Sequence, residues 1–414
     1  MKAEVANALP EHPGGAPNGL DAPENPRLVF ERAFWLVFAA SFALNMAANL
    51  FVLFPLWVVE LGGNASIIGA IIGTGSLAAL AARPGVGALI DRRGRKWTAL
   101  WFLVLDAIAI SLYFPIHSIG LPIFLVRAIH GAIEGTARVA LFAMVYEMLP
   151  RGREGEAMAT FSLCGMVPGA IAPLVGEQLI RSLGFTVFFA LAIALIVASA
   201  IVVSFVVEQP HPAHASGDSP GGRSYRSLLT DRALMPLWIV TLMFSLALAS
   251  RLSFVAAYAY QEGVQRAGWY FAIYSLMAVG VRLVGGQVMD RMGLNRALAP
   301  SLAVLAIGLA LLAGTGRFGL LDIAAVIGGI GHGYLYPALS ALVIARTPLK
   351  STGRSSSIYS SLYDLGGMAG PYLLGVVAVT FGYGPMFIVS GSIALAGAIY
   401  FVIAEPDARL RFRN

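Results

Sequence analysis

The sequence has little charge and almost no cysteine. Of its 414 residues, 12% are Asp, Glu, Lys or Arg, 58% are hydrophobic, and Cys164 is the single cysteine. Because an average soluble protein carries about 25% charged residues, this composition excludes an ordinary soluble domain and indicates an integral membrane protein. One cysteine also excludes a disulfide framework.

Motifs for covalent or nucleotide chemistry are also missing. The sequence contains no nucleophile elbow, no phosphate-binding loop and no zinc-ligand spacing. We therefore expect neither an enzyme nor an internal ATPase motor, and we expect no cofactor and no metal. The net charge of +6 raises the question of nucleic-acid binding, but the positions of the cations give it another meaning.

Twelve apolar segments are each long enough to cross a hydrocarbon core of about 30 Å. They cover roughly residues 32–58, 66–88, 97–115, 120–148, 157–180, 184–207, 233–257, 266–288, 296–315, 319–345, 355–380 and 384–404. The sequence thus predicts an all-α integral membrane protein with twelve transmembrane helices.

The basic residues are distributed unequally between the two sides of these segments. The tails and the connections on their side carry 20 of the 28 Lys and Arg, whereas the opposite connections carry three, Arg181, Arg266 and Arg317. The positive-inside rule therefore places both termini in the cytoplasm. The excess of basic residues is therefore explained by the orientation of the chain in the membrane, so we expect no nucleic-acid partner.

Two long polar stretches and a short tail flank the apolar regions. Residues 1–31 lack an apolar core and are predicted to be a disordered cytoplasmic tail rather than a signal peptide. Residues 208–232 are expected to form a flexible cytoplasmic linker between bundles at 32–207 and 233–404, and 405–414 a second cytoplasmic tail.

The two halves repeat. At an offset of 199 residues, Arg83, Gly87, Asp91, Arg92 and Gly94 are matched by Arg282, Gly286, Asp290, Arg291 and Gly293. At an offset of 198, the pairs are Gly131 and Gly329, Glu134 and His332, Gly135 and Gly333, and Pro173 and Pro371. Such near-constant spacing indicates two related six-helix bundles.

A charged stretch, GALIDRRGRKWTAL at 87–100, joins two of the apolar segments. It resembles the G-x-L-A-D-R-x-G-R-K-x-x-L loop of the major facilitator superfamily, with Ile90 in place of alanine. The resemblance implies two pseudo-symmetric six-helix bundles that alternate access to a central cavity. By that resemblance the candidate gating residues are Arg83, Gly87, Asp91, Arg92, Gly94, Arg95, Arg282, Gly286, Asp290 and Arg291, with Arg83–Asp91 and Arg282–Asp290 as ion pairs.

The fourth segment carries four ionisable residues within RAIHGAIEGTAR. Arg127, Glu134 and Arg138 fall on one stripe of a helix, with His130 beside them. Such residues in a spanning helix face the bundle interior or a water-filled cavity. The candidate proton-coupling residues are Arg127, Glu134, Arg138, His332 and Asp364, where Arg127 and Gly131 match an R-x-x-x-G segment of proton-coupled facilitators.

Structural alternatives remain open for these groups. Glu134 and Arg138 have the spacing of a self-neutralising salt bridge. His332 could be a buried packing residue, and Asp364 could pair with Arg251 or cap a broken helix. Asp106 is a weaker candidate, which could only neutralise a neighbouring helix.

Polar and aromatic residues in the segments expected to line the cavity are candidates for substrate contact. The candidates are Asn45, Asn49, His130, Arg251, Tyr334, Tyr336, Tyr359 and Tyr363. Tyrosine offers an apolar ring and one hydroxyl, which suits an amphipathic organic ligand. The fifth segment, GMVPGAIAPLVGE, resembles the Gly/Pro-rich signature of facilitator antiporters, but Ala172-Pro173 and Gly176-Glu177 depart from it.

From about residue 32 to 404 the chain resembles the bacterial twelve-span efflux branch of that superfamily, which includes sugar-efflux-like and drug–proton antiporter members. The resemblance implies a protein of the bacterial inner membrane. We therefore predict a secondary transporter that exports a small amphiphilic organic compound in exchange for protons. The expected partners are the small-molecule substrate, protons and the lipid bilayer, and a monomer is expected to suffice. Two alternatives stay open: a proton-coupled importer of a small organic solute, and a sensor or assembly factor that keeps the fold without turnover.

Overall fold

The computed structural model describes residues 32–149, 153–207, 223–317 and 319–405, and every regular element in these ranges is a helix. In chain order the elements are α1 (Arg32–Leu50), η1 (Phe51–Leu53), α2 (Phe54–Glu60), α3 (Ala65–Arg93), α4 (Arg95–Ser111), α5 (Leu121–Glu147), α6 (Glu154–Ser204), α7 (Tyr225–Leu229), α8 (Met235–Gln261), α9 (Ala267–Met292), α10 (Leu294–Leu311), η2 (Leu312–Gly314), α11 (Leu320–Ala345), η3 (Leu349–Ser351), α12 (Thr352–Phe381) and α13 (Tyr383–Ala404).

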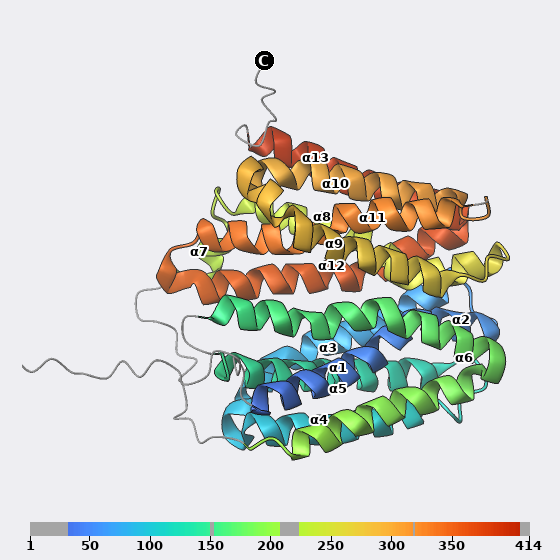
Figure 1. Ribbon diagram of the computed structural model, residues 1–414. Coiled ribbons are helices and arrows are strands. Elements are labelled where there is room, and N and C mark those ends of the chain that lie inside the picture. Colours follow the sequence, from blue (N-terminus) through green and yellow to red (C-terminus); the bar gives the residue numbers. More distant parts are fainter. Residues whose placement is uncertain (1–31, 150–152, 208–222, 318, 406–414) are drawn as a thin grey trace, which may run out of the picture.

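The helices form two groups, stacked in Figure 1. Helices α1 to α6 lie together and are called the N-half, and α8 to α13 lie together and are called the C-half. Helix α3 packs against α12 and α6 against α9, so these two pairs join the halves. We call the side on which α7 lies the linker side, and the opposite side the far side.

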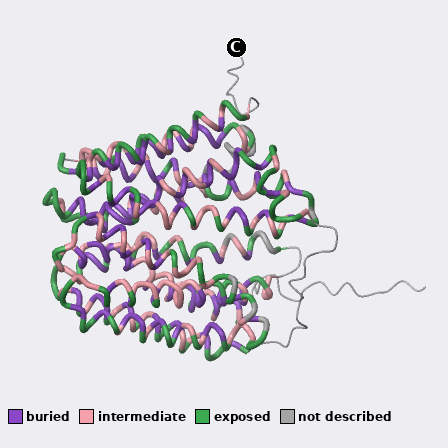
Figure 2. Tube along the Cα trace, turned by 180° about the vertical axis from the view of Figure 1, so that it is seen from behind, coloured by how far each residue is buried: buried purple, intermediate pink, exposed green. Residues whose placement is uncertain are grey.

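Most helices have a buried face and an exposed apolar face, and Figure 2 shows the two alternating along the chain. Trp101, Leu283 and Leu373 are among the exposed large apolar side chains. Such a surface suits acyl chains rather than water. Among the described residues, nine helices are long and apolar enough to cross a membrane, with α6 counted once although it contains two of the predicted segments.

Two pairs of glycines give structural support to the repeat. Gly94 joins α3 to α4 with φ 83°, and Gly293 joins α9 to α10 with φ 81°. Gly184 interrupts α6 with φ 77°, and Gly382 joins α12 to α13 with φ 91°. L-residues other than glycine rarely adopt such backbone angles, so the same tight joint recurs at the same place in each half. The second pair was not recognised in the sequence.

The predicted segment boundaries need correction at these joints. The stretch 89–96 was expected to be a hydrophilic loop, but α3 continues to Arg93 and α4 begins at Arg95, so the connection is Gly94 alone. The predicted gap between residues 180 and 184 is likewise helical up to Gly184. In both places one glycine with a positive φ reverses the chain direction without a loop.

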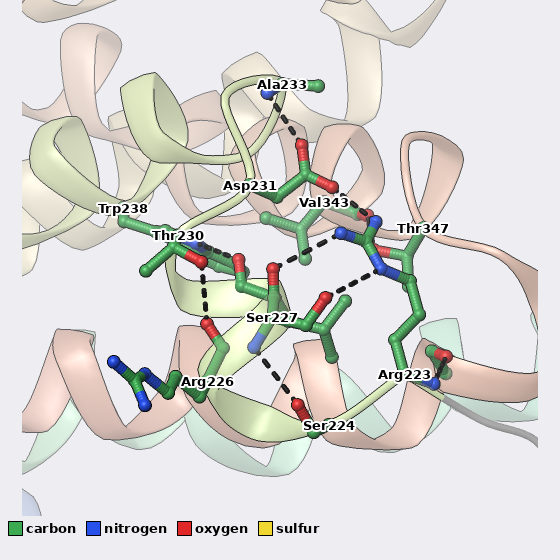
Figure 3. A network of polar contacts seen from close by, with 12 residues as sticks. Arg223, Ser224, Arg226, Ser227, Thr230, Asp231, Ala233, Trp238, Val343 and Thr347 are labelled. Carbon is green, nitrogen blue, oxygen red and sulfur yellow. Dashed lines mark hydrogen bonds and ion pairs between the residues drawn. The ribbon is translucent and has the colours of Figure 1, made fainter.

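The described end of the predicted linker, 223–232, contains helix α7. Ser224 caps the start of this helix, because its side chain accepts the Ser227 N–H at 3.2 Å. Arg223 pairs with Asp231 across the turn and its backbone N–H donates to Ser351 at 2.9 Å (Figure 3). The Ala233 N–H donates to Asp231 at 2.8 Å and, with Arg223, holds the pKa of that carboxyl below its usual value. These contacts attach the linker to the C-half.

Candidate functional site

The largest contrast in the molecule is between the ionisable residues buried in the two halves. Two glycines, one in each half, allow the helices that carry these residues to approach their neighbours closely. At Gly131 of α5 a side chain would collide with the backbone of Gly75 in α3, and at Gly329 of α11 it would lie 2.5 Å from the Tyr274 carbonyl oxygen of α9. These repeat-related close approaches bring Glu134 and His332 into the interior of their halves.

Along α5 the predicted stripe of charges is present and continues onto α1. Glu134 pairs with Arg138, as the spacing predicted. Arg138 also donates to the Asn45 side-chain oxygen at 3.4 Å, and the Asn45 amide donates to the Ser41 carbonyl at 2.8 Å. A cavity of about 230 Å³ adjoins Asn45 and Arg138 between α1, α5 and α6. Asn49 donates to the Asn45 carbonyl at 2.8 Å, so its amide group serves its own helix.

His130 joins this stripe to α4. Its Nδ1 lies 3.3 Å from an Arg127 nitrogen and 3.1 Å from the Tyr113 hydroxyl. Because a guanidinium can only donate, Nδ1 acts as the acceptor and the imidazole proton sits on Nε2. That atom faces Asp106 at 3.5 Å and Glu134 at 3.9 Å.

Asp106, the weaker candidate of the sequence analysis, lies beside the α5 stripe of charges. It is fully buried and faces His130 of the neighbouring helix, and neither of its oxygens makes a hydrogen bond to a described residue. Its role as a proton carrier or as a counter-charge to that helix stays a prediction. We call Asp106, His130, Glu134 and Arg138 the N-half network. Arg127 borders it, with its guanidinium 5.3 Å from the Phe54 ring centre.

Arg83 and Asp364 meet between the halves. They form an ion pair that links α3 to α12, and both line a cavity of about 260 Å³ between α3, α8 and α12. The sequence analysis paired Arg83 with Asp91 and considered Arg251 for Asp364. The Arg83–Asp364 pair joins different halves, and only the packing of α3 on α12 brings these two side chains together.

The C-half surrounds its cations with rings. Arg251 is buried, with its guanidinium 3.9 Å from the Tyr274 ring centre and 5.5 Å from that of Phe271. The His332 ring lies 5.6 Å from Tyr274 and 5.8 Å from Phe244, measured between ring centres. Among the described residues, Arg251 Nε, His332 Nδ1 and the Tyr274 hydroxyl have no hydrogen-bond partner.

The predicted tyrosines gather at the junction of α11 and α12. The Tyr336 ring lies 5.2 Å from Tyr359 and 5.1 Å from Tyr363, and Tyr359 donates to the Tyr336 carbonyl at 2.9 Å. Of these, Tyr363 lines the cavity of about 260 Å³ between α3, α8 and α12, which we call the central cavity. Tyr334 is half-buried on α11. Only one of the four tyrosines is therefore placed on that cavity.

The candidate gating residues are only partly described. Arg95 pairs with Glu147 at the end of α5, Arg92 is exposed, and Gly87 has open space around it. Arg282 donates its Nε to the Gly333 carbonyl at 2.6 Å. The surroundings of Gly286 and the side chains of Asp91, Asp290 and Arg291 are not described, so the predicted pairs Arg83–Asp91 and Arg282–Asp290 stay predictions.

Glu177 was treated in the sequence only as a departure from a glycine signature, but it joins the halves on the far side. Its carboxylate accepts the backbone N–H groups of Ala267 at 3.2 Å and Gly268 at 2.7 Å, at the start of α9. It also pairs with Arg181 at 2.9 Å. A carboxylate at a helix N-terminus is stabilised by unpaired N–H groups and by the helix dipole. An adjacent cavity of about 320 Å³ lies between α2, α6 and α8.

Comparison with known proteins agrees with this architecture. A family model described as Major Facilitator Superfamily matches residues 34–316 and 254–414. The chain is 28% identical over 385 residues to "Multidrug resistance protein MdtG" of Dickeya zeae, covering 90% of this chain and 94% of that protein. It is 22% identical over 378 residues to "Staphylopine export protein" of Staphylococcus aureus, covering 89% and 94%.

Solved structures share the fold. The nucleoside transporter NupG matches with a TM-score of 0.72 and 15% identity, covering 90% of this chain and 99% of that one. A POT family transporter in complex with 5-aminolevulinic acid matches with a TM-score of 0.73 and 14% identity, covering 91% and 96%. With both halves covered by the family model, the chain belongs to the Major Facilitator Superfamily and is a multi-pass membrane transporter, not an enzyme.

Proposed function

We propose that the protein exports small amphiphilic organic compounds in exchange for protons, by alternating access, in the bacterial inner membrane. The N-half network carries this proposal. It places the titratable Asp106, His130 and Glu134 in contact distance inside a spanning bundle, where buried ionisable groups mark proton and ion pathways. The direction of transport is supported by two relatives, one named a multidrug resistance protein and the other an export protein.

The contacts between the halves fit one state of an alternating cycle. Glu177 holds the start of α9, and the Thr74 hydroxyl lies 2.8 Å from that of Tyr372, both in the far-side half of the molecule. We propose that the linker side is cytoplasmic, that 32–207 and 233–404 move as two bundles, and that this state is closed on the far side. Breaking the Glu177 contact and the Thr74–Tyr372 contact then accompanies opening outward.

Proteoliposomes with an imposed pH gradient test the coupling. Suitable probes are naphthalene-2-sulfonate, naphthalene-2-sulfonamide and trimethyl(2-naphthyl)ammonium, because none changes its charge between pH 6 and 8. We expect at least one probe to accumulate in vesicles with an acidic lumen, and a protonophore to abolish this. Protein-free liposomes are the control.

The other outcomes identify the alternatives. Accumulation only in vesicles with an alkaline lumen would establish proton symport, which is the importer. Binding of a probe to the purified protein without flux under either gradient would establish a sensor. Both results contradict the proposed exchange, whatever the charge of the probe that binds.

A further inference from the structure

The C-half contains buried cations without a described counter-charge. Arg251 is buried among α8 and α9 side chains and makes no hydrogen bond or ion pair to any residue that the structure describes. Its contacts are the faces of Tyr274 and Phe271. A cation over an aromatic face gains about 0.5–2 kcal/mol. That is less than the several kcal/mol that removing a guanidinium from water costs.

A second guanidinium and a histidine lie in the same region. Arg282 uses one donor on the Gly333 carbonyl, one residue beyond His332. Both Arg251 and Arg282 lie within electrostatic range of His332 and of Tyr274. The region therefore has unused donors on Arg251 and Arg282, an open ring nitrogen on His332, and the Tyr274 hydroxyl, which has no described partner.

The C-half carboxylate beside the central cavity is already paired. Asp364 lies on the wall of the central cavity and pairs with Arg83 of the N-half. In the N-half, by contrast, Glu134 compensates Arg138 directly. The described part of the C-half thus has a local excess of positive charge, which an anion bound from outside the chain would compensate.

The surroundings determine what kind of anion fits. The Phe244 ring lies 5.8 Å from His332 and 5.9 Å from Tyr363, measured between ring centres, and Tyr363 forms part of the cavity wall. The cavity, about 260 Å³, is slightly smaller than the roughly 300–1,000 Å³ typical of small-molecule sites. Apolar rings beside guanidinium donors recognise a flat apolar body that ends in a carboxylate, sulfonate or phosphonate group.

We propose that the C-half binds the acidic group of an organic anion through Arg251, with Arg282 and Tyr274 as further donors, and that the aromatic body lies toward Tyr363 in the central cavity. Among amphiphiles, acids are then the preferred substrates. This deepens the proposed function and rests on it for transport, whereas binding can be tested without it.

Binding of three naphthalene probes to the purified full-length protein tests the charge preference. The probes are naphthalene-2-sulfonate, its neutral sulfonamide and the trimethylammonium cation, each titrated in detergent while tryptophan fluorescence or thermal unfolding is followed. We expect the sulfonate to bind at least tenfold more tightly than either of the others. Equal affinities, or a preference for the cation, would overturn the proposal.

Two variants locate the site. Arg251→Gln removes the guanidinium and is expected to weaken sulfonate binding at least tenfold while leaving sulfonamide binding within twofold. Arg266→Gln is the matched control, because Arg266 is exposed at the start of α9 and lies 3.6 Å from Asp322. Unchanged sulfonate affinity in Arg251→Gln would contradict the assignment, and if that variant does not fold, the charge preference of the unaltered protein decides.

Two further readouts separate this proposal from its neighbours. Titrations in gluconate and in chloride buffers distinguish an inorganic-anion site, since stabilisation by chloride equal to that by the sulfonate would overturn the organic-anion assignment. Sulfonate binding without flux under either pH gradient would contradict the proposed transport and leave the site standing. Equal flux of all three probes would contradict the organic-anion site and leave the proposed transport standing.

Discussion

Glu134 and His332 occupy equivalent positions, 198 residues apart, on helices that approach their neighbours through equivalent glycines. Their surroundings differ. Glu134 neutralises Arg138 and faces His130, whereas His332 lies among Tyr274, Phe244 and two guanidinium groups without a described carboxylate beside it. The same helical plan therefore holds a compensated network of titratable groups in one half and an aromatic, cationic site in the other. We infer a division of labour between proton and substrate.

Glu134→Gln should have the largest effect. The substitution removes the charge that compensates Arg138 and faces His130, so we expect accumulation of the naphthalene probes driven by pH to fall at least tenfold, with probe affinity within about twofold. Flux under imposed pH gradients and binding in detergent measure the two quantities. Glu156→Gln, which alters an exposed pair with Arg153, is the control. If Glu134→Gln still accumulates the probes in response to the pH gradient, the transported proton is carried by another residue.

His332→Glu should convert the C-half toward the N-half pattern. A carboxylate at this position would lie within electrostatic range of Arg251 and Arg282 and act as an internal counter-charge. We expect naphthalene-2-sulfonate affinity to fall about tenfold or more while the melting temperature holds or rises. His332→Gln introduces no charge and serves as the comparison. Equal losses in both variants would show that the ring, and not the missing anion, determines binding.

The contact of Glu177 with α9 tests how firmly the halves are joined on the far side. Hydrogen bonds to a charged group contribute about 1.5–3 kcal/mol. Glu177→Gln keeps an acceptor and loses the charge, so we expect a shift of about 1 kcal/mol, roughly fivefold, toward the outward-open state.

The rate at which an impermeant maleimide labels Ser275→Cys, in a Cys164→Ser background, reports this opening, because Ser275 lies against Gly169 between the halves. Arg181→Gln is the matched control, since Arg181 is the exposed partner of Glu177 and such pairs contribute about 0–1 kcal/mol. Labelling that is faster in Arg181→Gln than in Glu177→Gln would contradict a role for the α9 contact.

The smallest effect is expected at α7, which attaches the linker to the C-half. Because the pKa of Asp231 is lowered in the folded state, its stabilising contribution is present above the ordinary carboxyl pKa of about 4 and is lost as the pH falls through the lowered value. We expect a spin label at Arg226 to become more mobile as the pH falls below about 4. Asp231→Asn should be mobile throughout, and a label that loosens at higher pH would exclude this carboxyl as the cause.

The sequence sufficed for features that a single helix or a repeat determines. The Glu134–Arg138 pair follows from a spacing of four residues within one helix, and the family follows from the charged stretch after Gly87. Partners on different helices were missed or misassigned, because they depend on how helices rotate and cross. Asp106 with His130 and Arg83 with Asp364 are such cases.

Two further features were beyond the sequence for a related reason. In the sequence, Glu177 was only a departure from a glycine pattern. Its partners are backbone N–H groups of the C-half, and backbone groups cannot be recognised from residue types. Helix α7 was hidden in a segment whose composition suggested a linker, because its order comes from contacts with residues more than a hundred positions away.

The single-residue joint at Gly184 has a mechanical consequence. The part of α6 before it reaches across to α9 through Glu177, and the part after it is tied to α1, where Ser199 donates to the Ala40 carbonyl at 2.8 Å. With no loop to absorb displacement, a tilt of the first part on the far side is transmitted directly to the second. Residues inserted at Gly184 would let the Glu177 contact with α9 break without moving the rest of the N-half. We expect such a variant to open on the far side without transporting substrate.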